Sequence, residues 1–213
     1  MAATLFYFHD PMCSWCWGYQ ATWQRLLEKL PLHINLAYVL GGLAEDDDRP
    51  MPIDMQEAIQ GHWRRIAEEL GAEFNFEFWQ KCQPRRSTYP ACRAVVAASN
   101  HTTDELSGHG LALAMILAIQ KAYYLRAMNP SNIDTLCELA EELGIDREAF
   151  YQDMMSDKTE QSLQEQIAYS RNVGVSSFPS LLLDYKEKQY RLTVDYKEAG
   201  TTLEQINNIL SQA

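Results

Sequence analysis

The fold of this chain is limited first by a Cys-x-x-Cys motif that stands where an apolar strand meets a helix. Residues 4–9 (TLFYFH) have the aromatic-rich composition of a short buried strand, which an Asp-Pro pair ends. Cys13 and Cys16 follow at once, at the start of a helix predicted over 13–30 from its apolar spacing. Residues 33–40 then alternate in polarity, as a second strand does. The opening of the chain therefore predicts a parallel β-α-β unit.

The middle of the chain has a different pattern. After an acidic, proline-containing loop over 43–52, almost everything is helical in pattern, including one long apolar helix over 104–128. Strand character returns only at 180–184 and 190–194, and the polar residues between these segments predict a hairpin. A last helix begins at a threonine, Thr201 or Thr202, which is a favourable residue at a helix start.

These elements predict an α/β fold in two parts. Residues 1–42 and 157–213 would form one α/β domain, and residues 43–156 would form an all-helical domain inserted into it. The chain has 213 residues, enough to bury a core without disulfide bonds.

Composition and charge exclude several classes of protein. Acidic residues outnumber basic ones by 29 to 18, for a net charge of −11, whereas nucleic-acid binders and proteins of anionic membranes carry basic surfaces. No segment is apolar over 18 residues, so we expect no membrane span. The first residues lack a basic stretch followed by an apolar one, so no signal peptide is predicted and the expected location is cytoplasmic. The sequence leaves the oligomeric state open.

The cysteine pair has the setting of a redox site. Unpaired N–H groups and the helix dipole stabilise a thiolate at a helix N-terminus, which makes Cys13 the candidate nucleophile. Cys16 lies one turn further along, within disulfide reach, and would resolve the mixed disulfide. A zinc site would need a second ligand pair, but nine residues separate Cys82 from Cys92, so no metal is predicted. Two inert core cysteines are the remaining alternative, and Trp15 between them fits either a core or a docking surface.

Five segments resemble the DsbA-like thioredoxin-fold family, in the branch that holds FrnE-type proteins and candidate protein disulfide isomerases. They are HDPMCSWCWG at 9–18, VLGGLAEDDDRP at 39–50, HWRRIAEELGAEFNF at 62–76, STYPACRAVVAA at 87–98 and VGVSSFPSLLL at 173–183. The resemblance implies a thioredoxin fold interrupted by a helical domain. It also implies thiol–disulfide exchange with protein or small-thiol substrates, with Cys13 as nucleophile and Cys16 as resolving thiol. The Phe178-Pro179 bond is expected to be cis, so that its backbone positions the substrate.

Further candidates for substrate binding lie near these motifs. Trp15, Ser177 and Phe178 flank the catalytic residues Cys13, Cys16 and Pro179 in the sequence. His9 ends the first strand and would either support the thiolate or serve the structure. Arg93 belongs to a group of arginines that would line the groove over Cys13 or pair with surface acids. The other members of this group are Arg64, Arg65, Arg85 and Arg86.

Two other functions stay open at this point. Kappa-class glutathione transferases and 2-hydroxychromene-2-carboxylate isomerases share the superfamily, but a serine takes the first active position in them. In this chain that position corresponds to Cys13. A redox-inactive chaperone or adaptor is the second alternative. No cofactor beyond the dithiol is predicted, and glutathione is a potential co-substrate. The periplasmic relatives carry an export signal that is not seen here, so the direction of electron flow is not predicted.

Overall fold

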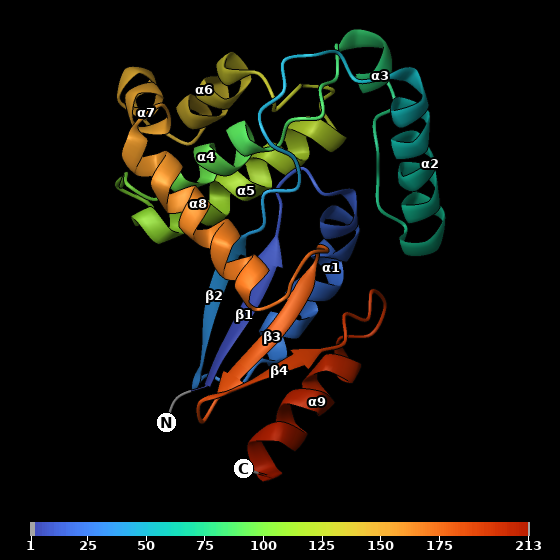
Figure 1. Ribbon diagram of the computed structural model, residues 1–213, viewed down its shortest axis with the longest axis vertical. Helices are drawn as coiled ribbons and strands as arrows, with labels where there is room; N and C mark the ends of the chain where they lie inside the picture. The colour runs from blue at the N-terminus through green and yellow to red at the C-terminus, as the bar shows by residue number, and fades with distance from the viewer. Residues whose placement is uncertain (1–2, 213) are drawn as a thin grey trace.

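The computed structural model describes residues 3–212 as a four-stranded sheet with helices on both faces (Figure 1). The strands are β1 (Ala3–His9), β2 (Ile34–Leu40), β3 (Ser180–Tyr185) and β4 (Lys188–Leu192). Their order across the sheet is β2-β1-β3-β4, with β2 parallel to β1 and both β3 and β4 antiparallel to their neighbours. The parallel pair and its connecting helix confirm the predicted β-α-β opening.

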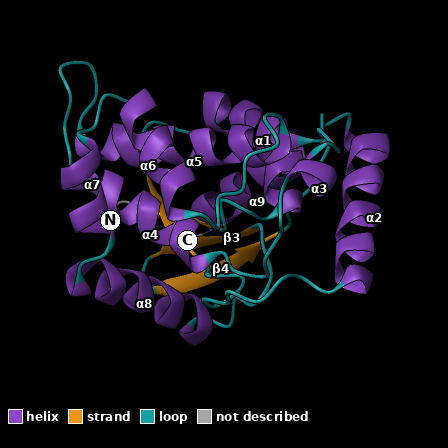
Figure 2. Cartoon of the chain, turned by 90° about the horizontal axis from the view of Figure 1, so that it is seen from above, coloured by secondary structure: helices purple, strands orange, loops and turns teal. Residues whose placement is uncertain are grey.

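The helices, in chain order, are α1 (Ser14–Lys29), α2 (Ile53–Leu70), α3 (Phe78–Lys81), α4 (Tyr89–Ala98), α5 (Gly108–Tyr124), α6 (Ile133–Glu142), α7 (Arg147–Met154), α8 (Asp157–Asn172) and α9 (Ala199–Gln212). On the sheet, α1 and α9 pack on one face and α8 packs on the other. The helices α2 to α7 form a separate helical layer. Figure 2 shows α2 on the opposite side of the molecule from α7 and α8. None of these helices is both long and apolar enough to cross a membrane.

Each face of the sheet has its own apolar core, because side chains alternate along β1. Leu5 and Tyr7 point to one face, where they pack with Trp23 of α1 and Ile206 of α9. Phe8 points to the other face, where it packs with Val175, just after α8. β1 is therefore an inner strand of the sheet, and apolar side chains pack against both faces of its carboxyl end.

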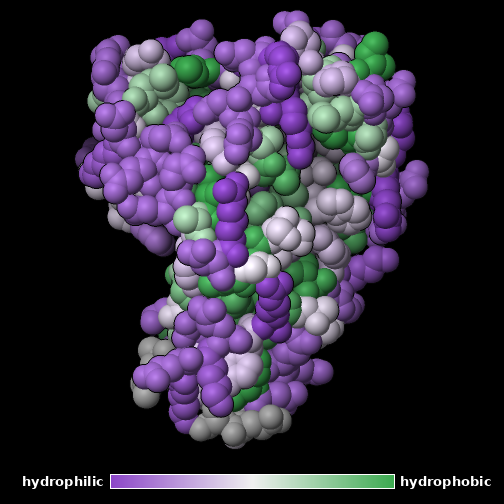
Figure 3. Space-filling model, in the orientation of Figure 1, coloured by the Kyte–Doolittle hydropathy of each residue, from purple (hydrophilic) through white to green (hydrophobic). Residues whose placement is uncertain are grey.

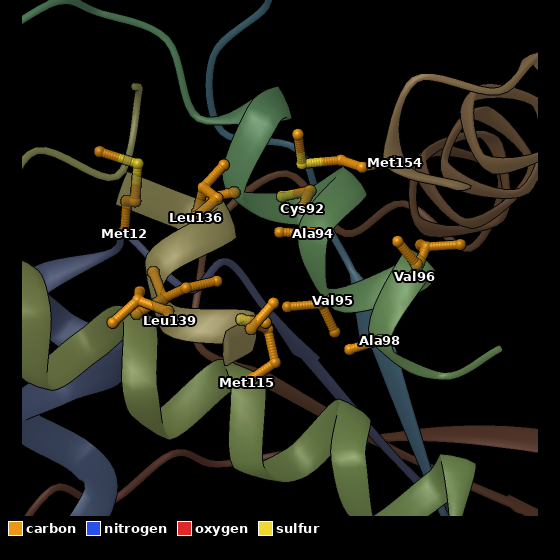
Figure 4. Packing of buried hydrophobic residues seen from close by; sticks show 14 of the residues in the cluster. Met12, Cys92, Ala94, Val95, Val96, Ala98, Met115, Leu136, Leu139 and Met154 are labelled. Carbon is orange, nitrogen blue, oxygen red and sulfur yellow. The ribbon is translucent and has the colours of Figure 1, made fainter. Parts of the chain in front are cut away.

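A third core joins the helical layer to the top of the sheet. In Figure 4 the side chains of Val95, Met115 and Leu139 meet from α4, α5 and α6. The same cluster includes Met12, directly before the cysteine pair, and Leu40, the last residue of β2. The helical layer thus packs against the end of the sheet where β1 and β2 finish, which is the end next to the Cys-x-x-Cys motif.

The predicted fold class is confirmed: an α/β thioredoxin fold interrupted by helices. The division of the chain at residues 42 and 157 stays a prediction. Several element boundaries differ from expectation. α9 begins at Ala199, before Thr201 and Thr202, whose hydroxyls donate instead to the Asp195 carboxylate and the Thr193 carbonyl. α5 begins at Gly108 because the Ser107 hydroxyl caps it by accepting a hydrogen bond from the Gly110 N–H. The hairpin turn is only two residues long, since Lys186 and Glu187 both have positive φ, so β4 begins earlier than predicted.

Candidate active site

Cys13 stands at the N-terminal end of α1, directly after a tight turn from β1. Its backbone is extended, with φ −80° and ψ 116°, and it occupies the N-cap position. Its N–H donates to the Asp10 carbonyl at 3.0 Å, which closes the turn. Its Sγ donates to the Phe178 carbonyl at 3.4 Å. The thiol is therefore held between a helix N-terminus and the loop before β3.

Cys16 lies one turn further along α1 and is fully buried. Burial is the largest cause that raises its pKa well above the usual thiol range, and a hydrogen bond with Cys13 adds to the effect. The Tyr7 hydroxyl hydrogen-bonds to the same side chain. Both cysteines are free thiols in this structure. The pair combines one thiol at a helix terminus with one that is kept protonated by its surroundings.

The loop before β3 is fixed by close packing against the end of β2. The Phe178-Pro179 bond is cis, as expected. The Phe178 ring lies directly over Gly41, where an added Cβ would come within 1.9 Å of the ring. Only glycine leaves room for this contact, so Gly41 allows Phe178 to turn its carbonyl toward Cys13.

A hollow of about 320 Å³ opens beside Cys13. Its walls come from the α1 start, α2, the segment before α4 and the loop before β3. The lining residues that bear on chemistry are Cys13, Trp15, His62, Arg85, Arg86, Ser177 and Phe178. On the face seen in Figure 3, hydrophobic side chains gather between the helical layer and the sheet, within a mostly hydrophilic surface. The structure thus brings together Cys13, Trp15, Ser177 and Phe178 from the predicted set.

A buried carboxylate, Asp10, anchors the turn before Cys13. Asp10 is fully buried and accepts hydrogen bonds from Met12 N–H at 2.8 Å, Leu43 N–H at 2.7 Å and the Thr88 hydroxyl at 2.7 Å. The Cys92 thiol donates to it at 3.6 Å. Burial raises the pKa of Asp10, and these donors act against that shift. Asp10 therefore links the turn before Cys13 to the helical layer. A local sequence pattern does not predict contacts with residues as distant as Leu43 and Thr88.

Two of the predicted binding residues lie away from this hollow. His9 is 1% exposed and stacks on Tyr7 with ring centroids 5.3 Å apart, and it does not line the Cys13 hollow. Burial lowers the pKa of His9 to about 3, so its ring is neutral at pH 7. Arg93 forms ion pairs with Asp46 at 2.7 Å and Glu160 at 3.0 Å. These two ion pairs link α4 to α8 and to the loop after β2.

The remaining arginines separate into two pairs. Arg65 lies over the Trp15 ring at 5.5 Å, and Arg64 lies over Phe76 at 5.7 Å. Arg85 and Arg86 line the Cys13 hollow. Arg85 donates to the Ser131 carbonyl and to Asn132, but its buried Nε has no hydrogen-bond partner. The sequence grouped these side chains, and only the fold selects which of them face the thiol.

Solved structures with the same fold include proteins of disulfide chemistry. A candidate protein disulfide isomerase from Nitrosomonas europaea is 25% identical, with a TM-score of 0.83 and coverage of 100% of this chain and 99% of that one. The cytosolic disulfide reductase DsbM from Pseudomonas aeruginosa is 21% identical, with a TM-score of 0.77 and coverage of 99% and 100%.

Sequence comparison finds two curated relatives and a family. ClpXP adapter proteins SpxH from Halalkalibacterium halodurans and Bacillus subtilis are 21% and 24% identical over 84% and 83% of this chain. The chain spans little more than half of their length, 57% and 56%. A family model described as thioredoxin matches residues 6–205. The match over residues 6–205 shows that the chain belongs to the thioredoxin family.

Proposed function

We propose that this protein is a thiol–disulfide oxidoreductase in which Cys13 exchanges disulfides and Cys16 resolves them. The observation that carries the proposal is the contrast between the two thiols. Cys13 is 7% exposed, lines the hollow at a helix N-terminus and donates to the Phe178 carbonyl, whereas Cys16 is 0% exposed and does not line the hollow. A nucleophile in the wall of a hollow with a fully shielded partner suits a two-step exchange, because the intermediate is attacked from inside the protein.

The proposed reaction balances in two steps. The Cys13 thiolate attacks one sulfur of a substrate disulfide R–S–S–R′, so a Cys13–S–S–R bond forms and R′S⁻ leaves. Cys16 then gives its proton to R′S⁻ or to water, and its sulfur attacks Cys13. The Cys13–Cys16 disulfide forms and RS⁻ leaves, so two electrons pass to the substrate. Two molecules of a small thiol restore the dithiol and form their own disulfide, and the reverse sequence oxidises a substrate dithiol.

We further propose that the substrate or the reducing thiol carries carboxylates, as glutathione does. Arg85 and Arg86 line the hollow with Cys13, and Arg86 has no hydrogen bond or ion pair within residues 3–212. In a chain of net charge −11, cationic side chains at this place favour an anionic ligand locally. The DsbM neighbour, named a cytosolic disulfide reductase, also has a structure with GSH, which supports a glutathione partner and the predicted cytoplasmic location.

Single cysteine substitutions test the mechanism. Cys13→Ser should abolish disulfide reduction, because it removes the attacking sulfur. Cys16→Ser should instead accumulate a mixed disulfide on Cys13, which intact-mass measurement with glutathione disulfide would detect as one added glutathionyl group. Cys82→Ser is the matched control, since that thiol lies outside the hollow and a serine can still donate to the Ala127 carbonyl. Full activity in Cys13→Ser would refute the proposal.

An arginine substitution tests the substrate class. Arg86→Ala should raise KM for glutathione disulfide about tenfold, the loss of one charge-assisted contact, and leave kcat nearly unchanged. The uncharged hydroxyethyl disulfide should be reduced equally by both proteins. Arg64→Ala, which removes a cation stacked on Phe76 outside the hollow, should behave as wild type. An equal loss with both substrates would exclude recognition of the carboxylates.

An adaptor function is the second candidate, since the curated relatives are named ClpXP adapter proteins. Such a protein would bind its partner without turnover of the dithiol. A Cys13→Ser, Cys16→Ser double variant separates the two functions, because it would keep partner binding and lose only redox activity. A glutathione-dependent transferase or isomerase would show a third result: activity that survives Cys16→Ser and requires glutathione.

A further inference from the structure

Tyr124, the last residue of α5, contacts the chain on both sides of the Cys-x-x-Cys motif. It is fully buried in the core that joins the helical layer to the sheet. Its hydroxyl donates to the Met12 carbonyl at 2.7 Å. Its ring stacks on Trp17, with ring centroids 5.5 Å apart and an angle of 18° between the planes. Met12 directly precedes Cys13 and Trp17 directly follows Cys16, so one side chain spans the motif.

The contact with Met12 completes the hydrogen bonding of the turn that carries Cys13. The Met12 N–H donates to Asp10 Oδ1 at 2.8 Å, and the Cys13 N–H donates to the Asp10 carbonyl at 3.0 Å. The Cys13 carbonyl accepts from the Trp17 N–H at 3.1 Å. Tyr124 supplies the donor for the Met12 carbonyl. The peptide group between Met12 and Cys13 is therefore held by Asp10 from one side and by Tyr124 from the other.

The contact with Trp17 holds the first turn of α1, which carries Cys16. The Trp17 indole N–H donates to the Glu73 carbonyl at 3.0 Å, and the Asn75 N–H donates to the Tyr124 carbonyl at 2.6 Å. The segment after α2 thus binds both Trp17 and Tyr124 and keeps their rings stacked. These contacts connect the backbone on either side of the two cysteines through a single residue of the helical layer.

The Tyr124 hydroxyl stays a hydrogen-bond donor while the cysteines change their protonation. Burial raises the pKa of Tyr124 well above its usual range, and the neighbouring Tyr123, Cys13 and Cys16 raise it further. The phenol therefore keeps its proton at any pH at which a thiolate attacks a disulfide. Its bond to the Met12 carbonyl can persist through both steps of the exchange.

We propose that Tyr124 is a positioning residue for closure of the Cys13–Cys16 disulfide. This role rests on the proposed thiol–disulfide exchange and acts in its second step, in which the Cys16 sulfur attacks Cys13 and RS⁻ leaves. Two groups react faster and bond more favourably when their relative orientation is fixed beforehand, because the entropy of ordering them has already been lost. Tyr124 takes no part in the bond changes and acts through the backbone of Met12 and the first turn of α1.

Tyr124→Phe tests the hydroxyl alone, since it keeps the ring on Trp17. The equilibrium constant for the Cys13–Cys16 disulfide in glutathione buffers, measured by alkylation and mass spectrometry, should fall about fivefold, the effect of one lost hydrogen bond. The mixed disulfide between Cys13 and glutathione should persist about fivefold longer before Cys16 displaces it. Alkylation of reduced Cys13 by iodoacetamide should keep its wild-type rate, because that reaction does not involve Cys16.

Tyr38→Phe is the control for a purely structural effect. It removes the hydroxyl that accepts from the Trp23 indole N–H at 3.1 Å, in the core on the α1 face of the sheet and outside the Cys13 hollow. Both variants should lose similar stability in urea, and Tyr38→Phe should keep the wild-type equilibrium constant. An equal fall in both variants, or none in Tyr124→Phe, would overturn the positioning role alone. A wild-type protein that forms no Cys13–Cys16 disulfide at any glutathione ratio would refute the exchange mechanism and this role with it.

Discussion

At the scale of single residues, burial assigns different chemistry to side chains that lie close together in sequence. His9 and Cys13 are four positions apart and both are largely buried, yet the His9 ring stacks on Tyr7 while Cys13 lines the hollow in front of the Phe178 carbonyl. Side chains alternate along a strand, so the face that receives His9 is the one covered by α1 and α5. His9 therefore acts on stability, and the thiol depends on the helix terminus and on the backbone around it.

This burial of His9 predicts an acid-dependent loss of stability. Its pKa is about 3 in the folded protein and about 6.5 in an unfolded chain, so between these values only the unfolded state binds the extra proton. The contribution is fully present above pH 6.5 and is lost as the pH falls toward 3, by about 1.4 kcal/mol per pH unit. His9→Phe keeps the ring stacking and removes this term. Urea unfolding between pH 7 and pH 4 should show the wild type losing stability relative to the variant; parallel curves would contradict the assignment.

At the scale of elements, one glycine decides how α2 sits against α1. Gly18 faces α2, where an added Cβ would lie 2.6 Å from Ile66 Cγ2 and 3.0 Å from Leu70 Cδ1. This close approach sets the position of the α2 residues Ile59 and His62, which line the Cys13 hollow. The wall of the hollow therefore depends on a contact between helices as well as on its own side chains.

Two glycine substitutions separate packing from helix propensity. Gly18→Ala should destabilise the protein by about 1–3 kcal/mol through overpacking, less the gain in helix propensity, and should raise KM for disulfide substrates as α2 shifts. Gly61→Ala, within α2 but with no atom in contact distance of the added methyl, should stabilise by about 0.5–1 kcal/mol. Urea midpoints and steady-state kinetics measure both effects. Stabilisation by both substitutions would contradict this prediction, because it would show that α2 can accommodate the added methyl group at position 18 with no loss of stability.

At the scale of the whole molecule, one core crosses the predicted division between the sheet domain and the helical domain. Met12 and Leu40 come from the sheet segment, and they share a cluster with Trp63 and Leu111 of the helical layer. Asp10 adds a polar connection across the same junction through Leu43 and Thr88. The two parts hold each other in place, and the candidate active site lies where they meet.

A shared core predicts that the reduced protein unfolds as one cooperative unit. Differential scanning calorimetry should give a single transition whose calorimetric and van't Hoff enthalpies agree. A Trp63→Leu variant should lower this one transition without splitting it, because Trp63 is fully buried in the shared cluster. Two resolved transitions would instead assign separate stabilities to the two parts.

Local sequence pattern predicted the strands, the parallel opening, most of the helices and the place of the cysteine pair at a helix start, because hydrophobic period and helix-breaking residues act over a few neighbouring positions. It did not predict the short helix α3. It missed the two-residue turn at Lys186 and Glu187, where non-glycine residues take positive φ. Tertiary structure alone decided that Arg85 and Arg86 face the thiol while Arg93 pairs with acids, that Asp10 anchors the turn, and that His9 is buried. These outcomes depend on contacts between distant residues: Asp10 bonds Leu43 and Thr88, 33 and 78 positions away, and Arg93 pairs with Asp46, 47 positions away. A local sequence pattern does not specify which distant group supplies such a partner.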